Sequence, residues 1–320
     1  MYGWFSGLMC VGSVFGAVAW GAWMQALVAI FNTQNPGVTS AQSQSLNAQG
    51  QYWSAAFYVT YGMEFLCLSV AKLLVLHRMA DFAVAKRDGM SRRLAVGGRV
   101  VMAVVVAGNV AGLCGNVAAA VLCKQVGDLS NAAAAAFAAN STQAANAIVV
   151  QAFQKNNVAS GAASVQQFCE VAVLLIIILA FAVVGIANAR LVSSALRGMN
   201  DALAALRQIR RQIVVTTAFV FVTFLLRAVF SIMNALSNAL QNFGANCPTY
   251  CGIPCNNVWT LIGFLLVFTP EFQLIVVLIS SPLALLFALW GMTDKRTLQH
   301  MRAGRGRKVR MVSQPLVAAS

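Results

Sequence analysis

Long apolar runs separated by polar connections are the main pattern of this chain. Each run is long enough to cross the apolar core of a bilayer as a helix, which takes about 20 residues. The runs cover 4–31, 52–76, 100–122, 168–189, 213–236 and 259–290. The pattern therefore predicts an all-α, polytopic membrane protein with six transmembrane helices in residues 1–292, followed by a tail at 293–320.

The connections between the runs differ in character. Residues 32–51 are uncharged and rich in Gln, Asn and Ser, which indicates a loop. Residues 123–167 are rich in Ala, the best helix former, so we expect one or two helices there outside the membrane. Residues 201–240 read as one long helix that contains the fifth span, and the sixth span is predicted to bend at Pro270 or Pro282.

Charge supports a membrane protein rather than a nucleic-acid binder. Only 9% of the residues are charged, against about 25% in soluble domains, and 59% are hydrophobic. Most of the 22 Lys and Arg residues lie in 77–99, 190–211 and 293–320. By the positive-inside rule these segments and both termini are cytoplasmic, in a plasma membrane or endomembrane. The expected partners are the bilayer itself and, at the basic segments, a cytoplasmic protein or anionic lipid.

Charged residues inside the predicted spans are the first candidates for a site. A charge at bilayer depth is costly and usually serves a function. Glu64, Arg227 and Glu271 lie deep in their spans, whereas Lys72 lies close enough to one end to extend its ammonium group to the surface. Arg227 is predicted to pair with Glu271 or Glu64. Such a network is either a static lock between helices or a proton-linked or cation site, and the sequence leaves both open.

Polar and small residues within the spans predict contacts between helices. Asn109 and Asn116 in the third span are each expected to bond a neighbouring helix, because a lone amide in lipid is costly. In the first span, small-residue spacing that permits close helix approach occurs twice, at Gly12 with Gly16 and at Gly3 with Gly7.

Five of the eight cysteines fall on the predicted outer side. Their spacing matches no zinc motif and no histidine lies on that side, so disulfides are expected rather than a metal site. These cysteines are Cys123, Cys169, Cys247, Cys251 and Cys255. The sequence Asn140-Ser141-Thr142 on the same side is a glycosylation sequon, which predicts a glycan at Asn140 if this connection lies outside the cytoplasm.

The fifth and sixth spans carry a resemblance to a known family. The run 226–230 (Leu-Arg-Ala-Val-Phe), followed by Pro270-Glu271 in a span that ends at Lys295-Arg296, resembles the last two helices of the plant tobamovirus-multiplication type of seven-helix proteins and their animal relatives. The chain differs in that Pro270 precedes the glutamate, and in that six spans are readable, without a counterpart of the family's first helix. The resemblance implies a receptor-like or scaffolding helical bundle.

Catalytic signatures are not found in the sequence. It contains no histidine pair for haem, no Gly-x-Ser-x-Gly element and no phosphate-binding glycine loop. We therefore expect no enzymatic activity, cofactor or metal. The expected function is receptor-like or scaffolding. The alternative is a small-solute or ion transporter or channel that uses Glu64, Arg227 and Glu271.

Overall fold

The computed structural model describes residues 2–84, 90–196 and 203–240, together with Ile262. These residues form five α-helices and no strand: α1 (Tyr2–Asn32), α2 (Ser40–Val84), α3 (Met90–Ala138), α4 (Thr142–Leu196) and α5 (Leu203–Leu240). Helices α1 to α4 are long and apolar enough to cross a membrane. The all-α class is thus confirmed and the four long apolar helices are compatible with a membrane protein, whereas the count of six spans stays a prediction. The predicted sixth span, apart from Ile262, and the basic tail lie outside the described residues.

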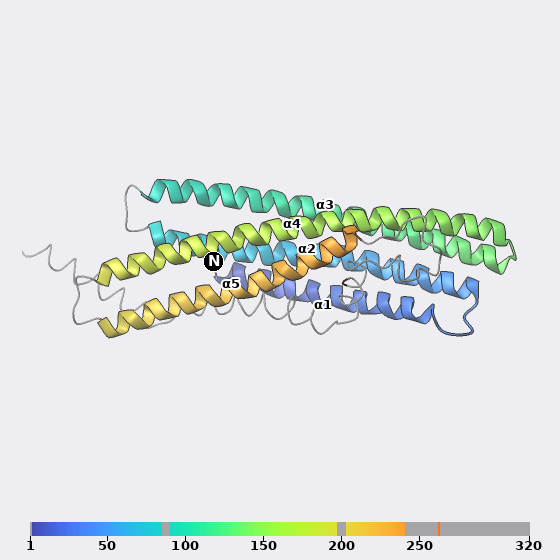
Figure 1. The fold of residues 1–320 in the computed structure, drawn as a ribbon, viewed down its shortest axis with the longest axis horizontal. Coiled ribbons are helices and arrows are strands. Elements are labelled where there is room, and N and C mark those ends of the chain that lie inside the picture. Colours follow the sequence, from blue (N-terminus) through green and yellow to red (C-terminus); the bar gives the residue numbers. More distant parts are fainter. Residues whose placement is uncertain (1, 85–89, 197–202, 241–261, 263–320) are drawn as a thin grey trace, which may run out of the picture.

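The helices form an elongated antiparallel bundle in which each packs against the next and α2 also contacts α4 (Figure 1). The 45, 49 and 55 residues of α2, α3 and α4 correspond to about 68, 74 and 83 Å at 1.5 Å per residue. The apolar core of a bilayer is only about 30 Å thick. These three helices therefore extend well beyond any bilayer that they cross.

One end of the bundle is basic. The C-terminal ends of α2 and α4 and the N-terminal ends of α3 and α5 lie at the same end of the bundle (Figure 1). The terminal parts of these helices carry four exposed basic side chains, His77, Arg99, Arg190 and Arg211. At the opposite end, α2, α3 and α4 continue past α5. We call residues 40–51 of α2, 123–138 of α3 and 142–167 of α4 the outer bundle.

The connection predicted at 32–51 is mostly helical, so the prediction of a loop is wrong for residues 40–51. Helix α2 starts after a reciprocal cap, in which the Gln42 amide donates to Thr39 Oγ1 (3.3 Å) and the Thr39 amide donates to Gln42 Oε1 (3.1 Å). This arrangement satisfies two backbone donors at the helix start. Of the polar residues that follow, Gln44, Asn47 and Gln51 are partly buried and face other helices of the outer bundle.

The Ala-rich connection is helical as predicted, but its two helices are continuous with the spans. Helix α3 runs unbroken from the basic end to Ala138, and α4 starts at Thr142 after a turn in which Asn140 has a φ of 57°. Asn tolerates this left-handed conformation better than most residues. The predicted long helix at 201–240 corresponds to α5.

A continuous buried seam along α3 shows that one packing pattern extends from the predicted third span into the outer bundle. Its residues alternate at spacings of four and three, the heptad spacing of coiled coils. The seam comprises Val105, Asn109, Gly112, Asn116, Ala119, Cys123, Val126, Ser130 and Ala133, all buried. No change of spacing occurs where the predicted third span ends.

Glycines bring α3 close to α4. A Cβ added at Gly115 would lie 3.0 Å from the Ala162 carbonyl oxygen, and one at Gly108 would lie 2.6 Å from Val173 Cγ2. On α1, Gly12 packs against Cys67 of α2, with 3.2 Å between the two Cβ positions, as the small-residue spacing predicted. The second predicted pair does not pack in this way, because nothing lies within 4 Å of a Cβ at Gly3 or Gly7.

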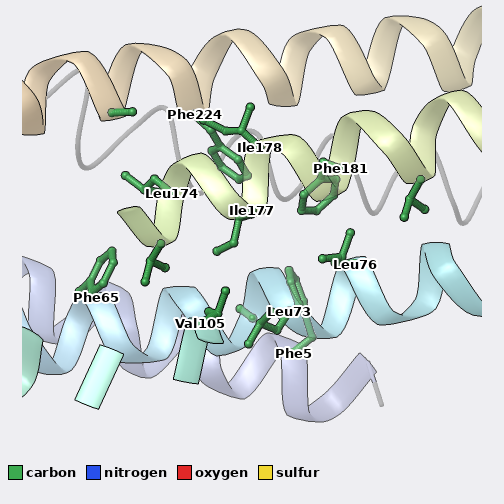
Figure 2. Close-up of a cluster of buried hydrophobic side chains, with 14 residues drawn as sticks. Phe5, Phe65, Leu73, Leu76, Val105, Leu174, Ile177, Ile178, Phe181 and Phe224 are labelled. Carbon is green, nitrogen blue, oxygen red and sulfur yellow. The ribbon is translucent and has the colours of Figure 1, made fainter. Parts of the chain in front are cut away.

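An apolar cluster joins all five helices toward the basic end. Figure 2 shows Phe224 of α5 next to Ile178 of α4, and Phe181 of α4 pointing toward α2. Phe5 of α1 and Val105 of α3 belong to the same cluster. The Phe181 and Phe224 rings meet edge to face, with centroids 6.0 Å apart. Such pairs add about 0.5–1.5 kcal/mol to the burial of apolar area. The cluster fixes α5 against α4 next to the charged residues described below.

Candidate functional site

Four ionisable side chains are buried between α2, α4 and α5. Glu64 and Lys72 of α2 are 2% and 0% exposed, Glu170 of α4 is 1% exposed, and Arg227 of α5 is 0% exposed. Two acids face two bases, so the formal charges of the four groups cancel. A neutral set is the arrangement in which several buried charges cost least.

Glu170 lies at the centre of this network. Its Oε1 accepts a hydrogen bond from Arg227 Nε at 3.0 Å, which makes a buried ion pair between α4 and α5. Its Oε2 accepts from the Tyr61 hydroxyl at 2.7 Å and from Gln166 Nε2 at 3.3 Å. The Arg227 guanidinium carbon also lies 6.0 Å from the centroid of the Phe65 ring. Three helices thus meet at one carboxylate.

The described structure thus gives Arg227 a partner, Glu170, that the sequence did not predict. The sequence pointed to Glu271 or Glu64. Glu271 lies outside the described residues, and Glu64 makes no ion pair with Arg227 among the described contacts. Glu170 was missed because it follows the start of the apolar run at Phe168 by two residues and so resembled an interfacial residue. Measuring depth along each helix from the basic end would have identified Glu170. It lies about 30 Å along α4 from Arg190, and Arg227 lies at a similar distance, about 24 Å along α5 from Arg211.

Glu64 and Lys72 form the less satisfied part of the network. Glu64 Oε2 and Lys72 Nζ are buried without a hydrogen-bond partner in the described structure. Lys72 does not extend to the surface as predicted, because the Phe224 ring covers it, with Nζ 4.7 Å from the ring centroid. Contact with an aromatic face offsets part of the cost of removing an ammonium group from water.

The two asparagines of α3 were predicted to form hydrogen bonds with neighbouring helices, and they do not form such bonds among the described residues. Asn109 Nδ2 donates to the Val105 carbonyl of its own helix at 2.6 Å. Asn116 is buried against Gly62 of α2, and its Nδ2 has no hydrogen-bond partner in the described residues. A Cβ added at Gly62 would lie 3.1 Å from that nitrogen. Asn116 thus fills space between α2 and α3 as part of the seam.

The predicted disulfides are not formed at the two cysteines that can be placed. Cys123 is a buried free thiol in the seam of α3, and Cys169 is a partly buried free thiol of α4. Packing between helices, rather than covalent bonding, explains their positions. Cys247, Cys251 and Cys255 lie outside the described residues. Among the described residues, no group of three or more His, Cys, Asp or Glu side chains is placed to hold a metal ion.

The outer bundle carries its own polar contacts. The Tyr52 hydroxyl donates to Asp128 at 2.8 Å, and Lys124 pairs with the same carboxylate at 2.9 Å. The hydrogen bond from Lys124 lowers the pKa of Asp128 from its ordinary value. Asn140, at the turn between α3 and α4, is exposed together with the other two residues of its sequon. The sequon is thus accessible, while the glycan stays a prediction.

A cleft of about 240 Å³ opens between the three helices of the outer bundle. Four of its lining side chains are amides and none is charged; the lining comprises Gln44, Asn47, Gln51, Val126, Val149, Ala152, Phe153 and Asn156. None of the four buried charged residues lines this cleft. The buried charges and the open polar surface therefore occupy different parts of the molecule.

No family model, curated protein or solved structure matches the chain.

Proposed function

We propose that this chain is a receptor-like or scaffolding membrane protein without catalytic activity, in which the outer bundle binds or displays and the basic end faces cytoplasmic partners. One observation carries the proposal: α2, α3 and α4 continue without a break from the apolar region into the outer bundle. The resemblance of the run 226–230 to the tobamovirus-multiplication type of proteins points in the same direction, and it stays a resemblance.

Continuous helices offer a direct mechanical path. The heptad seam of α3 passes residue 122, where the predicted span ends, without a change of spacing. A helix that tilts or rotates at Ala133 must therefore move its other end, unless it bends. A flexible loop at this level would uncouple the two parts, and the described residues have none in α2, α3 or α4.

The buried charge network supports this role as a lock. The Glu170 carboxylate holds Tyr61 of α2 and Arg227 of α5 at a single level of the bundle. A buried polar group with satisfied partners favours one arrangement of helices over alternatives in which the charge would be unpaired. In the proposed receptor-like protein, the contacts of Glu170 fix the axial positions of α2, α4 and α5 relative to one another.

The coupling between the outer bundle and the basic end can be measured by cross-linking the helices in the outer bundle and recording a distance between helices at the basic end. Cysteines replacing the exposed Ala138 and Thr142, which flank the outer turn, are cross-linked in a variant that lacks the native cysteines. Nitroxides attached through non-natural amino acids at Arg99 and Arg190 report the distance distribution at the basic end. We expect the cross-link to narrow this distribution.

The matched control carries three glycines inserted after Leu122, which interrupt α3 between the cross-link and the labels. There the cross-link should leave the distribution unchanged. If cross-linking leaves the distance distribution at the basic end unchanged in the parent chain, the proposed coupling is contradicted.

Transport of a small solute or ion is the second candidate function. The observation that favours it is that Glu64 and Lys72 are buried without hydrogen-bond partners in the described structure, which a static lock does not require. If the chain transports a solute or ion, the flux of that species into proteoliposomes should fall in the Glu64→Gln variant while the protein stays folded. A lock predicts instead that this variant changes stability only.

A further inference from the structure

The cleft of the outer bundle has a lining that is unusual for a contact between helices. Gln44, Asn47 and Gln51 lie on one face of α2 and point into the bundle, where apolar residues are expected. Asn156 of α4 lies across from them. Val126 of α3 is only 2% exposed and belongs to the buried floor.

Most of these amides have unused hydrogen-bonding capacity. Asn47 Nδ2 donates to Ser130 Oγ at 3.2 Å. The side chains of Gln44, Gln51 and Asn156 make no hydrogen bond within the described part of the chain. Each amide offers two donor hydrogens and a carbonyl acceptor. The cleft thus presents donors and acceptors side by side, together with an apolar floor.

Charge restricts the ligand that this cleft fits. No ionised side chain lines it, and the two nearby lysines are engaged elsewhere: Lys155 donates to Gln125 at 2.7 Å, and Lys124 pairs with Asp128. An anion or a cation would lose water without gaining a counter-charge. Size restricts it further, because about 240 Å³ is less than the roughly 300–1,000 Å³ of pockets for drug-sized ligands.

We propose that the outer cleft binds a neutral sugar, one pyranose ring deep, either free or at the end of a glycan. Adjacent hydroxyls of a sugar donate and accept at the same time, which matches the amides of Gln44, Gln51 and Asn156. The C–H face of the ring packs on an apolar or aromatic surface, which Val126, Ala152 and the half-exposed Phe153 provide. This inference rests on the proposed receptor-like function and names its class of ligand.

The test uses the full chain in lipid nanodiscs and saturation-transfer NMR. The probes are glucose, galactose and N-acetylglucosamine, with glucosamine and glucuronate as charged counterparts. We expect saturable binding of at least one neutral sugar and none of the charged ones. Gln51→Leu and Asn156→Leu should each weaken binding about tenfold.

Matched controls lie next to the cleft residues. Gln49 and Asn157 are exposed amides outside the cleft lining, so Gln49→Leu and Asn157→Leu should leave the affinity unchanged. Gln44→Met is a third cleft variant, which keeps the side-chain length and should also weaken binding. Every variant must elute as a single species. The proposal is overturned if no neutral sugar binds, if only a charged probe binds, or if control and cleft variants lose affinity equally.

The two proposals fail separately. If no sugar binds but the cross-link still narrows the distance distribution at the basic end, the proposed ligand class is wrong and the receptor-like function stands. Sugar binding without that narrowing would identify a binding protein in which the outer bundle is not coupled to the basic end.

Discussion

At the scale of single residues, Glu170 explains why an arginine can be buried in α5. It supplies the counter-charge, and Tyr61 and Gln166 satisfy its second oxygen. Removing one partner of a buried pair leaves an uncompensated charge, whereas replacing both with apolar groups is often nearly neutral. The pair therefore matters more for which arrangement forms than for the total stability.

Replacing Arg227 alone should be costly for this reason. We expect Arg227→Leu to lower the free energy of unfolding in a detergent titration by about 3–5 kcal/mol, and Glu170→Leu with Arg227→Leu to recover most of that loss. The control on the same helix is Arg211→Leu at an exposed position, with an effect of about 0.5 kcal/mol or less. Equal stability of Arg227→Leu and the parent would show that the ion pair is not formed.

The sequence predicted part of this network. Arg227 and Glu64 were identified because a charge within an apolar run is conspicuous. Glu170 was not, because it lies near the edge of its run and only the continuation of α4 shows that it is enclosed. Lys72 was placed at the surface, and only the position of Phe224 on a different helix reveals its burial. Contacts between distant segments decided both cases.

At the scale of elements, the close approach of α3 and α4 depends on small residues. Gly115 lies against the backbone of α4, which cannot yield as a flexible side chain would. Gly98, on the same helix, has nothing within 4 Å of the position of a Cβ. The same substitution should therefore have opposite effects at the two positions.

We expect Gly115→Ala to lower the free energy of unfolding by about 1–3 kcal/mol, because the helices must separate. Gly98→Ala should raise it by about 0.5–1 kcal/mol, because Ala is the better helix former. Thermal unfolding of both variants in the same detergent measures the difference. A stabilising Gly115→Ala would mean that α3 and α4 are not in contact there.

The ends of a helix could be predicted from the sequence where the helix is apolar, but not where its buried face is polar. Helix α1 matches its predicted span within two residues at either end. The outer part of α2 was assigned to a loop, because its bundle-facing positions are amides and no hydrophobic period marks the helix. The seam of α3 was hidden similarly, since several of its members are Gly, Asn, Ser or Cys.

At the scale of the whole molecule, the proposed function requires the outer bundle and the basic end to lie on opposite sides of the membrane. Asn140 lies at the tip of the outer bundle, about 27 Å along α3 from the predicted end of the third span. In microsomes we expect one glycan at this sequon, detected as a shift in mass that an endoglycosidase removes.

Thr142→Val removes the sequon and keeps the Asn140 turn, so this variant should lack the shift. Absence of the glycan in the parent chain, together with cleavage of an epitope at Asn140 by protease added to inside-out vesicles, would reverse the orientation.

In the proposed receptor-like protein α3 leaves the membrane unbroken, and a nitroxide scan along this helix tests that continuity. A continuous stripe of exposed positions runs through Ala103, Ala107, Val110, Cys114, Val117, Val121, Lys124, Asp128, Asn131 and Ala135. Collision rates with oxygen and with a water-soluble nickel complex distinguish lipid from water at each label. We expect lipid contact up to about Val121 and water contact from Lys124 onward. Flanking labels in the buried seam should stay protected from both probes as far as Ala133. Loss of this alternation beyond residue 122, or lipid contact throughout the stripe, would contradict this expectation.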